Sequence, residues 1–141
     1  MKRATAAFTL VEAIAVLLLI GVLTAVAVSR LQDTGANAVA EADILEAHLR
    51  HAQQLAMADD TATWGLSVAS GSYTLLKDGA AAARALPGEA SSTHTLDNTS
   101  VTSGAGTVTF DNLGSPGTAT LTIIVGNTHT VTITRNTGYI P

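Results

Sequence analysis

The sequence predicts an α+β protein in which a long N-terminal helix packs on a small antiparallel β-sheet. Three observations support this prediction. An apolar run lies close to the N-terminus, an amphipathic pattern with helical periodicity follows it, and the second half is rich in Thr, Gly and Ser and alternates between strand-like segments and turns. A length of 141 residues leaves room for one membrane segment and one small domain.

The apolar run is long enough to cross a membrane. Residues 13–28 read AIAVLLLIGVLTAVAV, and Thr24 is their only polar side chain. Counted from residue 8 to residue 28, a helix here measures about 31 Å, close to the roughly 30 Å of a bilayer's hydrocarbon core. We therefore predict a transmembrane helix at residues 8–29.

Charged residues beside the run predict its orientation. Lys2 and Arg3 precede it, whereas Arg30 is followed closely by Asp33. Because cytoplasmic flanks of membrane helices carry an excess of Lys and Arg, the N-terminus is expected in the cytoplasm and the remainder of the chain outside.

Two simpler explanations fit the same segment. It can be an uncleaved anchor, or a secretory signal peptide cleaved after Ala27 to release a soluble binding domain. Neither explains Glu12, since a carboxylate near the bilayer centre costs roughly 2.5–3.5 kcal/mol on insertion scales. Glu12 lies near the start of the helix, however, so it can also reach the lipid headgroups and simply be tolerated there.

Residues 30–60 predict an amphipathic helix that packs on the domain through one face. Its apolar positions recur at intervals of seven, four and three residues: Leu31, Ala38, Ala42, Leu45, Leu49, Ala52 and Ala56. The positions between them are polar: Glu41, Glu46, Arg50 and Gln53. Gly35 costs about 1 kcal/mol relative to Ala inside a helix, so we expect a break or a loosening of the helix around Asp33-Thr34-Gly35. The helix is expected to end near Asp59-Asp60.

Residues 61–141 predict the antiparallel sheet. Two hairpins are expected, one with Ser70-Gly71 and one with Gly126-Asn127 at the turn. Residues 80–93, which contain Pro87-Gly88, are expected to form a loop. The predicted strands are Trp64–Ala69, Ser72–Lys77, Thr107–Phe110, Thr118–Val125 and Thr128–Thr134.

The composition argues against several classes of function. No cysteine is present, so neither a disulfide framework nor a thiolate metal site can form. The net charge of −4 disfavours a nucleic-acid partner held by general charge, and beyond Arg84 the only further Lys or Arg is Arg135.

The histidines and acids of the sequence do not form the pattern of a metal or catalytic site. We expect His48 and His51 to be a surface pair, because no set of three or four convergent ligands accompanies them. We expect His94 and His129 to be solvated, because they lie among threonines in a loop and a strand. Asp59-Asp60 and Asp111-Asn112 are interpreted as helix-end and turn residues, since calcium-loop spacing is missing. No nucleophile elbow or phosphate loop occurs. The sequence thus predicts no catalytic residue, metal or cofactor.

The stretch Ala7-Phe8-Thr9-Leu10-Val11-Glu12, behind a short basic leader and before an apolar helix, resembles the processing signature of type IV prepilins and type II secretion pseudopilins. The resemblance implies a pilin-like fold, a leader at residues 1–7, cleavage between Ala7 and Phe8 by a prepilin peptidase, and methylation of Phe8. Ala7 stands where the family has glycine, and Ser29 where many major pilins have proline. Gly21 matches the helix glycine of the family.

The resemblance also implies a role for Glu12, which would pair with the N-terminal amine of a neighbouring subunit and set the axial register of the filament. Implied partners are other pilin or pseudopilin subunits, the prepilin peptidase and the inner-membrane assembly platform. The implied location is the inner membrane, with the domain in the periplasm, and then the filament.

Looser motifs resemble the minor-pilin and pseudopilin-H group, including minor pilins of mannose-sensitive haemagglutinin-type pili. They are Leu49 to Ala56, Val108-Thr109-Phe110-Asp111 with Leu113-Gly114, and the ending Thr137 to Pro141. The expected function is that of a structural minor pilin of a type IV pilus. A minor pseudopilin of a type II secretion system and a secreted binding domain are the alternatives.

Overall fold

The computed structural model describes residues 9–141, with the side chains of residues 29–34 excepted. The chain divides into two units, and the division falls between Asp33 and Thr34. The predicted leader and the Ala7/Phe8 cleavage site lie outside the described residues.

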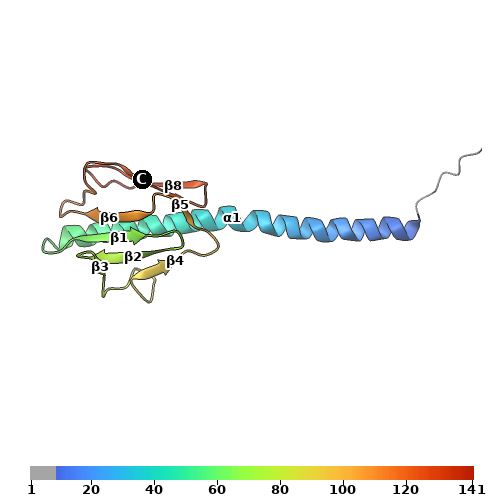
Figure 1. Cartoon of the computed structure of the whole chain (residues 1–141), viewed down its shortest axis with the longest axis horizontal. Coiled ribbons are helices and arrows are strands. Elements are labelled where there is room, and N and C mark those ends of the chain that lie inside the picture. The colour runs from blue at the N-terminus through green and yellow to red at the C-terminus, as the bar shows by residue number, and fades with distance from the viewer. Residues whose placement is uncertain (1–8) are drawn as a thin grey trace, which may run out of the picture. The chain divides into compact units, whose positions relative to one another are not determined.

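Helix α1 (Leu10–Ala58) runs through both units, as Figure 1 shows. Its end at Ala58 confirms the expected end near Asp59-Asp60. A break around Asp33-Thr34-Gly35 is wrong, because α1 continues through these residues, whereas a loosening there stays a prediction. One glycine costs only about 1 kcal/mol, whereas a break would require a second helix to be nucleated.

The larger sheet lies in the second unit and has the order β3-β2-β1-β6, with β4 also paired to β2. All its pairings are antiparallel. Its strands are β1 (Trp64–Val68), β2 (Ser72–Lys77), β3 (Ala80–Ala81), β4 (Thr93–Thr95) and β6 (Gly106–Phe110). The first predicted hairpin is confirmed, since Val68 pairs with Tyr73 at the turn and Trp64 pairs with Lys77 at the open end.

A second sheet has the order β5-β7-β8 and is also antiparallel. Its strands are β5 (Val101–Ser103), β7 (Leu121–Val125) and β8 (His129–Ile133). The hairpin at Gly126-Asn127 is confirmed, with Val125 opposite His129. Both turn residues have positive φ, which glycine and asparagine adopt most readily.

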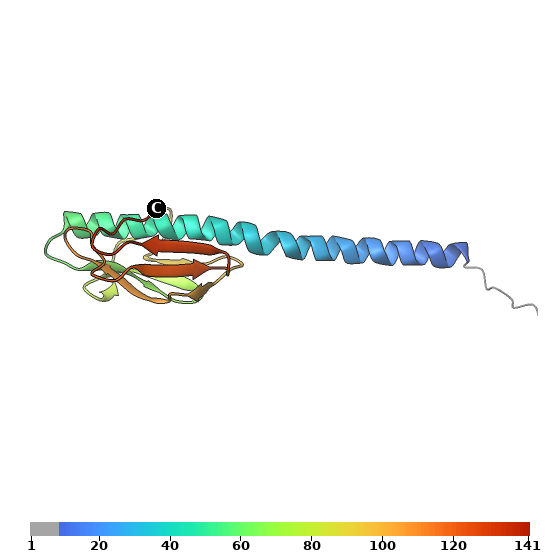
Figure 2. The same cartoon turned by 90° about the horizontal axis from the view of Figure 1, so that it is seen from above.

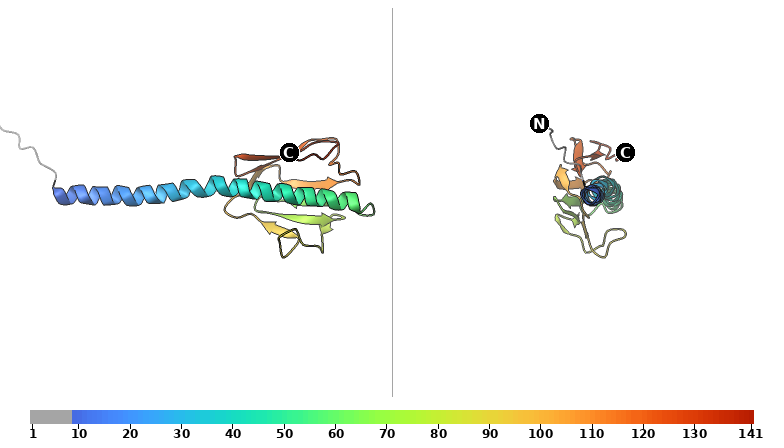
Figure 3. Two further views of the ribbon diagram at one scale, coloured as in Figure 1. Left: turned by 180° about the vertical axis from the view of Figure 1, so that it is seen from behind. Right: turned by 90° about the vertical axis from the view of Figure 1, so that its right-hand side faces the viewer.

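Both sheets lie on the same side of the helical segment of the second unit (Figure 2), and an end-on view shows the strands gathered there (Figure 3). Every predicted apolar position of this helix segment whose side chain is described is buried: Ala38, Ala42, Leu45, Leu49, Ala52 and Ala56. The sheets contribute Leu66, Leu75, Phe110, Ile123, Val131 and Ile133 to the same core. The predicted α+β arrangement is confirmed.

The predicted loop at residues 80–93 is partly wrong. Ala80–Ala81 and Thr93 belong to strands, and Ala82 and Leu86 are buried in the core. A backbone hydrogen bond from Leu86 N to Ser91 O (2.9 Å) closes this segment on itself, and one from Leu75 N to Ser92 O (2.7 Å) joins it to β2. The segment is therefore an ordered cover rather than a free loop.

Candidate functional site

The first candidate site is the apolar half of α1. Residues 10–28 form the only segment among the described residues that is long and apolar enough to cross a membrane, a test that a signal sequence also passes. Its large apolar side chains are exposed, from Leu10 and Val11 to Val26 and Val28. Thr24, the only polar side chain of residues 13–28, donates its hydroxyl to the carbonyl of Ile20 at 2.7 Å. Such an exposed apolar surface is suited to lipid or to neighbouring helices.

Glu12 lies in the first turn of α1, and its surroundings show a feature that the sequence analysis missed. The backbone N–H of Glu12 donates to Thr9 Oγ1 at 3.3 Å and to Thr9 O at 3.1 Å, so Thr9 caps the helix. Thr9 and Glu12 have the T-x-x-E spacing of a capping box, and that spacing could have revealed the cap. The carboxylate of Glu12 also lies at the positive end of the helix dipole.

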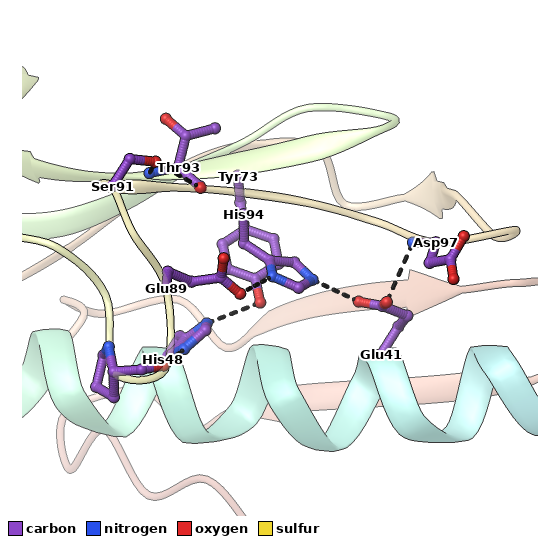
Figure 4. A network of polar contacts seen from close by, with 9 residues as sticks. Glu41, His48, Tyr73, Glu89, Ser91, Thr93, His94 and Asp97 are labelled. Carbon is purple, nitrogen blue, oxygen red and sulfur yellow. Dashed lines mark hydrogen bonds and ion pairs between the residues drawn. The ribbon is translucent and has the colours of Figure 1, made fainter.

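The second candidate site is a buried polar network in the second unit (Figure 4). Glu41 of α1 and His94 of β4 are 6 % and 8 % exposed, and they meet through His94 Nε2 and Glu41 Oε2 at 2.7 Å. The other ring nitrogen of His94, Nδ1, lies 2.6 Å from Oε1 of Glu89. Glu41 Oε1 accepts a hydrogen bond from Asp97 N at 3.1 Å. The imidazole therefore sits between two carboxylates.

His48 continues the network one side chain away. Its Nδ1 lies 2.8 Å from the hydroxyl of Tyr73, and its Nε2 lies 2.9 Å from the carbonyl oxygen of Pro87. Since a carbonyl oxygen can only accept, the proton is on Nε2 and the Tyr73 hydroxyl can donate to Nδ1. The Tyr73 ring stacks on His94, with centroids 5.0 Å apart.

These positions overturn two expectations. His48 is not on the surface but 3 % exposed, and His94 is not solvated. The partners that bury each ring lie in segments distant in the chain, Tyr73 and Pro87 for His48 and Glu41 for His94. The helix spacing held a signal, because Glu41 and His48 are seven residues apart and each follows a buried residue, Ala38 or Leu45, by three.

The ionisation of the network follows from these contacts. Burial lowers the pKa of His94, but hydrogen bonds and charge interactions with Glu89 and Glu41 outweigh burial, so the net pKa is raised. Burial and the same two carboxylates raise the pKa of Tyr73. Burial, Arg84 and His48 lower the pKa of His51. Its Nε2 is buried and has no hydrogen-bond partner among the described residues.

Asp59 confirms its expected helix-end role. Its Oδ1 accepts from the hydroxyl of Thr61 at 2.6 Å, and its Oδ2 accepts from Lys77 Nζ at 3.0 Å and Trp64 Nε1 at 3.2 Å. These hydrogen bonds, that from Thr61 foremost, hold the pKa of Asp59 well below its usual range. Asp59 therefore joins the end of α1 to β1 and β2.

Asp111 confirms its expected turn role. Its Oδ1 accepts backbone hydrogen bonds from Leu113 at 3.0 Å and Ser115 at 2.8 Å. Asp60, Asp78 and Asp111 line a cavity of about 220 Å³. In the part of the chain that the structure describes, however, no three His, Asp or Glu side chains are grouped so as to hold a metal ion.

Comparison with protein families decides the family of this chain. The family described as Type II transport protein GspH matches residues 41–138. The chain belongs to the GspH family. GspH proteins are minor pseudopilins of type II secretion, which are structural subunits that assemble with other pseudopilins, and the family is not one of enzymes.

The GspH match begins at Glu41, so it rests on the domain and is independent of the N-terminal signature. It confirms the resemblance to the pseudopilin-H group. Together with the apolar segment of residues 10–28, it fits a single-pass inner-membrane protein. Comparisons with curated proteins and with solved structures find no match.

Proposed function

We propose that this chain is a minor pseudopilin of a type II secretion system, cleaved between Ala7 and Phe8 by a prepilin peptidase and assembled into a filament through the apolar half of α1. The observation that carries the proposal is the combination of a GspH domain at residues 41–138 with an exposed apolar segment at residues 10–28. The domain identifies the family, and the apolar segment supplies a surface for packing between subunits.

The location of Glu12 supports the processing and assembly steps of the proposal. Cleavage before Phe8 would create an ammonium group four residues before Glu12, close to the start of α1 at Leu10. A carboxylate in an apolar filament core is tolerable when it is paired with an opposite charge. We infer that Glu12 pairs with the N-terminal amine of a neighbouring subunit. This pair would fix the axial register of apolar helices that could otherwise slide past one another.

The proposed partners and location follow from this assembly. The chain would meet the prepilin peptidase and the assembly platform in the inner membrane, with its N-terminus in the cytoplasm and its domain in the periplasm. The positive charges of Lys2 and Arg3 support this orientation. The proposed organisation is a leader at residues 1–7, an assembly helix at residues 8–29, an amphipathic half at residues 30–60 and a sheet domain at residues 61–141.

Two alternatives make different predictions. A type IV pilus minor pilin would share the processing step, and the ending Thr137 to Pro141 resembles such proteins. Co-purification with pseudopilins or with pilus subunits separates these two filaments. A secreted domain would instead be cleaved after Ala27 and lose the apolar segment.

The decisive experiment is N-terminal sequencing and intact mass measurement of the protein recovered from membranes after co-expression with a prepilin peptidase. We expect a mature chain that begins with methylated Phe8. The matched control is expression without the peptidase, which should leave the chain starting at Met1. A start at Val28, or a start at Met1 despite an active peptidase, would contradict the proposal.

A further inference from the structure

Three ionisable side chains from separate segments meet inside the domain, as Figure 4 shows. Glu41 comes from α1, His94 from β4, and Glu89 from the segment between β3 and β4. The side chains of His94 and Glu41 are 10 % and 8 % exposed, and that of Glu89 is 30 % exposed. None of the functions discussed above uses this cluster.

The two short contacts of His94 fix how many protons the cluster binds. Carboxylate oxygens and unprotonated imidazole nitrogens are all acceptors, so contacts of 2.7 Å to Glu41 and 2.6 Å to Glu89 each need a proton between the two atoms. The three groups together therefore bind two protons, which corresponds to an imidazolium between two carboxylates. Charge-assisted hydrogen bonds of this length are among the stronger ones in proteins.

The remaining groups around His94 stabilise this arrangement. Tyr73 of β2 stacks on the His94 ring, and His48 of α1 approaches it edge-on with centroids 5.9 Å apart. Both ring nitrogens of His48 are occupied by Tyr73 and Pro87, so His48 does not compete for the carboxylates. Asp97 contributes a backbone N–H to Glu41.

The contacts tie one segment to the helix at several points. Glu41 Oε2 contacts His94 of β4, which in turn contacts Glu89. Glu41 Oε1 accepts the hydrogen bond from the backbone N–H of Asp97. His48, two helical turns further along the same face, holds the carbonyl of Pro87. Residues 86–97 are thus fastened to α1, and they cover the core through the buried side chains of Leu86 and Leu96.

We propose that His94 is a proton-operated latch. Its doubly protonated ring bridges Glu41 and Glu89 and holds residues 86–97 on α1, and loss of one proton weakens this attachment. A neutral imidazole has a single N–H, so deprotonation leaves one carboxylate without its donor and removes the positive charge between two acids. The segment then opens more readily, and the apolar surface beneath Leu86 and Leu96 becomes accessible.

The sign of the pH dependence follows from proton counting. Since the folded pKa of His94 is raised, its contribution to stability is fully present below the unfolded value of about 6.5 and is lost as pH rises through the folded value. Between these values the folded state binds one proton more than the unfolded state. The unfolding equilibrium constant therefore rises up to about tenfold per pH unit in this range.

Two other groups of the domain, His51 and Tyr73, have shifted pKa values that act outside this window. Because the pKa of His51 is lowered in the folded state, His51 affects the pH dependence of stability only below its unfolded value of about 6.5. The raised pKa of Tyr73 acts only above about pH 10, where unfolded tyrosine ionises. Between about pH 6.5 and pH 10 neither shift contributes, so the pH dependence in this range reports the latch.

The test is urea unfolding of the full chain in detergent micelles at several pH values in this range. Trp64 is the only tryptophan and is buried in the domain, so its fluorescence reports domain unfolding. We expect the unfolding constant of the wild-type protein to rise steeply with pH and that of His94→Gln to be nearly flat. The matched control is His129→Gln on β8, which should keep the wild-type slope. A His94→Gln slope equal to that of His129→Gln would overturn the proposal.

A second measurement covers the case in which His94→Gln does not fold. Nitrogen-15 chemical shifts of the His94 ring in the wild-type chain report its protonation directly. We expect both ring nitrogens to stay protonated above the ordinary histidine pKa of about 6.5. Glu89→Gln, which keeps an oxygen acceptor but loses the charge, should move the titration to lower pH. Titration of the His94 ring at or below about pH 6.5, or an unmoved titration in Glu89→Gln, would overturn the latch.

Discussion

The side-chain amide of Gln53 donates a hydrogen bond to the carbonyl oxygen of Gly138 at 3.0 Å, and it also donates to the carbonyl of Gly114 at 2.7 Å. One residue of α1 thereby holds two loops that lie far apart in the sequence. Gly138 has φ of 64°, and a Cβ atom added to it would lie 1.9 Å from Gly114 O and 2.3 Å from Gln53 Nε2. Glycine is needed at this position for both its conformation and its size.

We therefore predict that Gly138→Ala destabilises the domain. The left-handed backbone and the close contacts together should lower the free energy of unfolding by about 2–5 kcal/mol. The matched control is Gly79→Ala, because Gly79 has φ of 79° but no atom within 4 Å of an added Cβ. Its loss should be about 1 kcal/mol. Urea unfolding monitored through Trp64 fluorescence measures the stability of both variants. Equal losses of stability would show that the contacts of Gln53 and Gly114 do not constrain residue 138.

Tyr73 supplies the second prediction, because its hydroxyl lies 2.8 Å from the buried Nδ1 of His48 and can donate a hydrogen bond to it. Tyr73→Phe should lower the free energy of unfolding by about 1–3 kcal/mol, since a buried acceptor loses its partner while the packing of the ring is kept. The matched control is Tyr139→Phe at a 65 % exposed position, where we expect a change within about 0.5 kcal/mol. If both variants have the stability of the wild type, the hydrogen bond to His48 contributes nothing measurable.

The sequence predicted the parts of the fold that are governed by periodicity. The buried stripe from Ala38 to Ala56 follows from helical spacing, and the hairpin at Gly126-Asn127 follows from turn residues between two alternating strands. The three-residue strands β4 and β5 were missed, because each is too short for an alternating pattern to stand out. They exist through pairing with β2 and β7, which local sequence does not encode.

The candidate site was harder to predict than the fold for a related reason. His94 is surrounded in the sequence by serine and threonine, which suggests solvent, but its carboxylate partner Glu41 is 53 residues away. Burial of a polar side chain depends on whether a distant partner satisfies it, and a single sequence does not display that pairing. The helix cap at Thr9 differs in this respect, because the T-x-x-E spacing of Thr9 and Glu12 is local and can be recognised in the sequence.

Glu12 carries the third prediction, since two physical explanations for it can now be separated. As the acid of a capping box it would stabilise the start of α1, and as an intersubunit partner it would need its charge. Glu12→Gln keeps a side chain suited to the capping position but removes the charge, whereas Glu12→Ala removes both. Thr9→Ala removes the hydroxyl that accepts from Glu12 N and leaves the carboxylate in place.

We expect Glu12→Ala and Glu12→Gln to insert into the membrane and to assemble poorly when co-expressed with partner pseudopilins, because a neutral amide does not pair with an ammonium group. Thr9→Ala should assemble normally, since loss of a cap costs about 1 kcal/mol and the apolar segment still inserts. The measurement is the fraction of each variant recovered in sheared filaments relative to the membrane fraction. Thr24→Ala, at the other polar side chain of the segment, is the control for substitution within the helix. A different result would contradict the intersubunit charge pair: Glu12→Gln enters filaments normally, whereas Thr9→Ala and Glu12→Ala do not. Glu12 would then act as a helix cap.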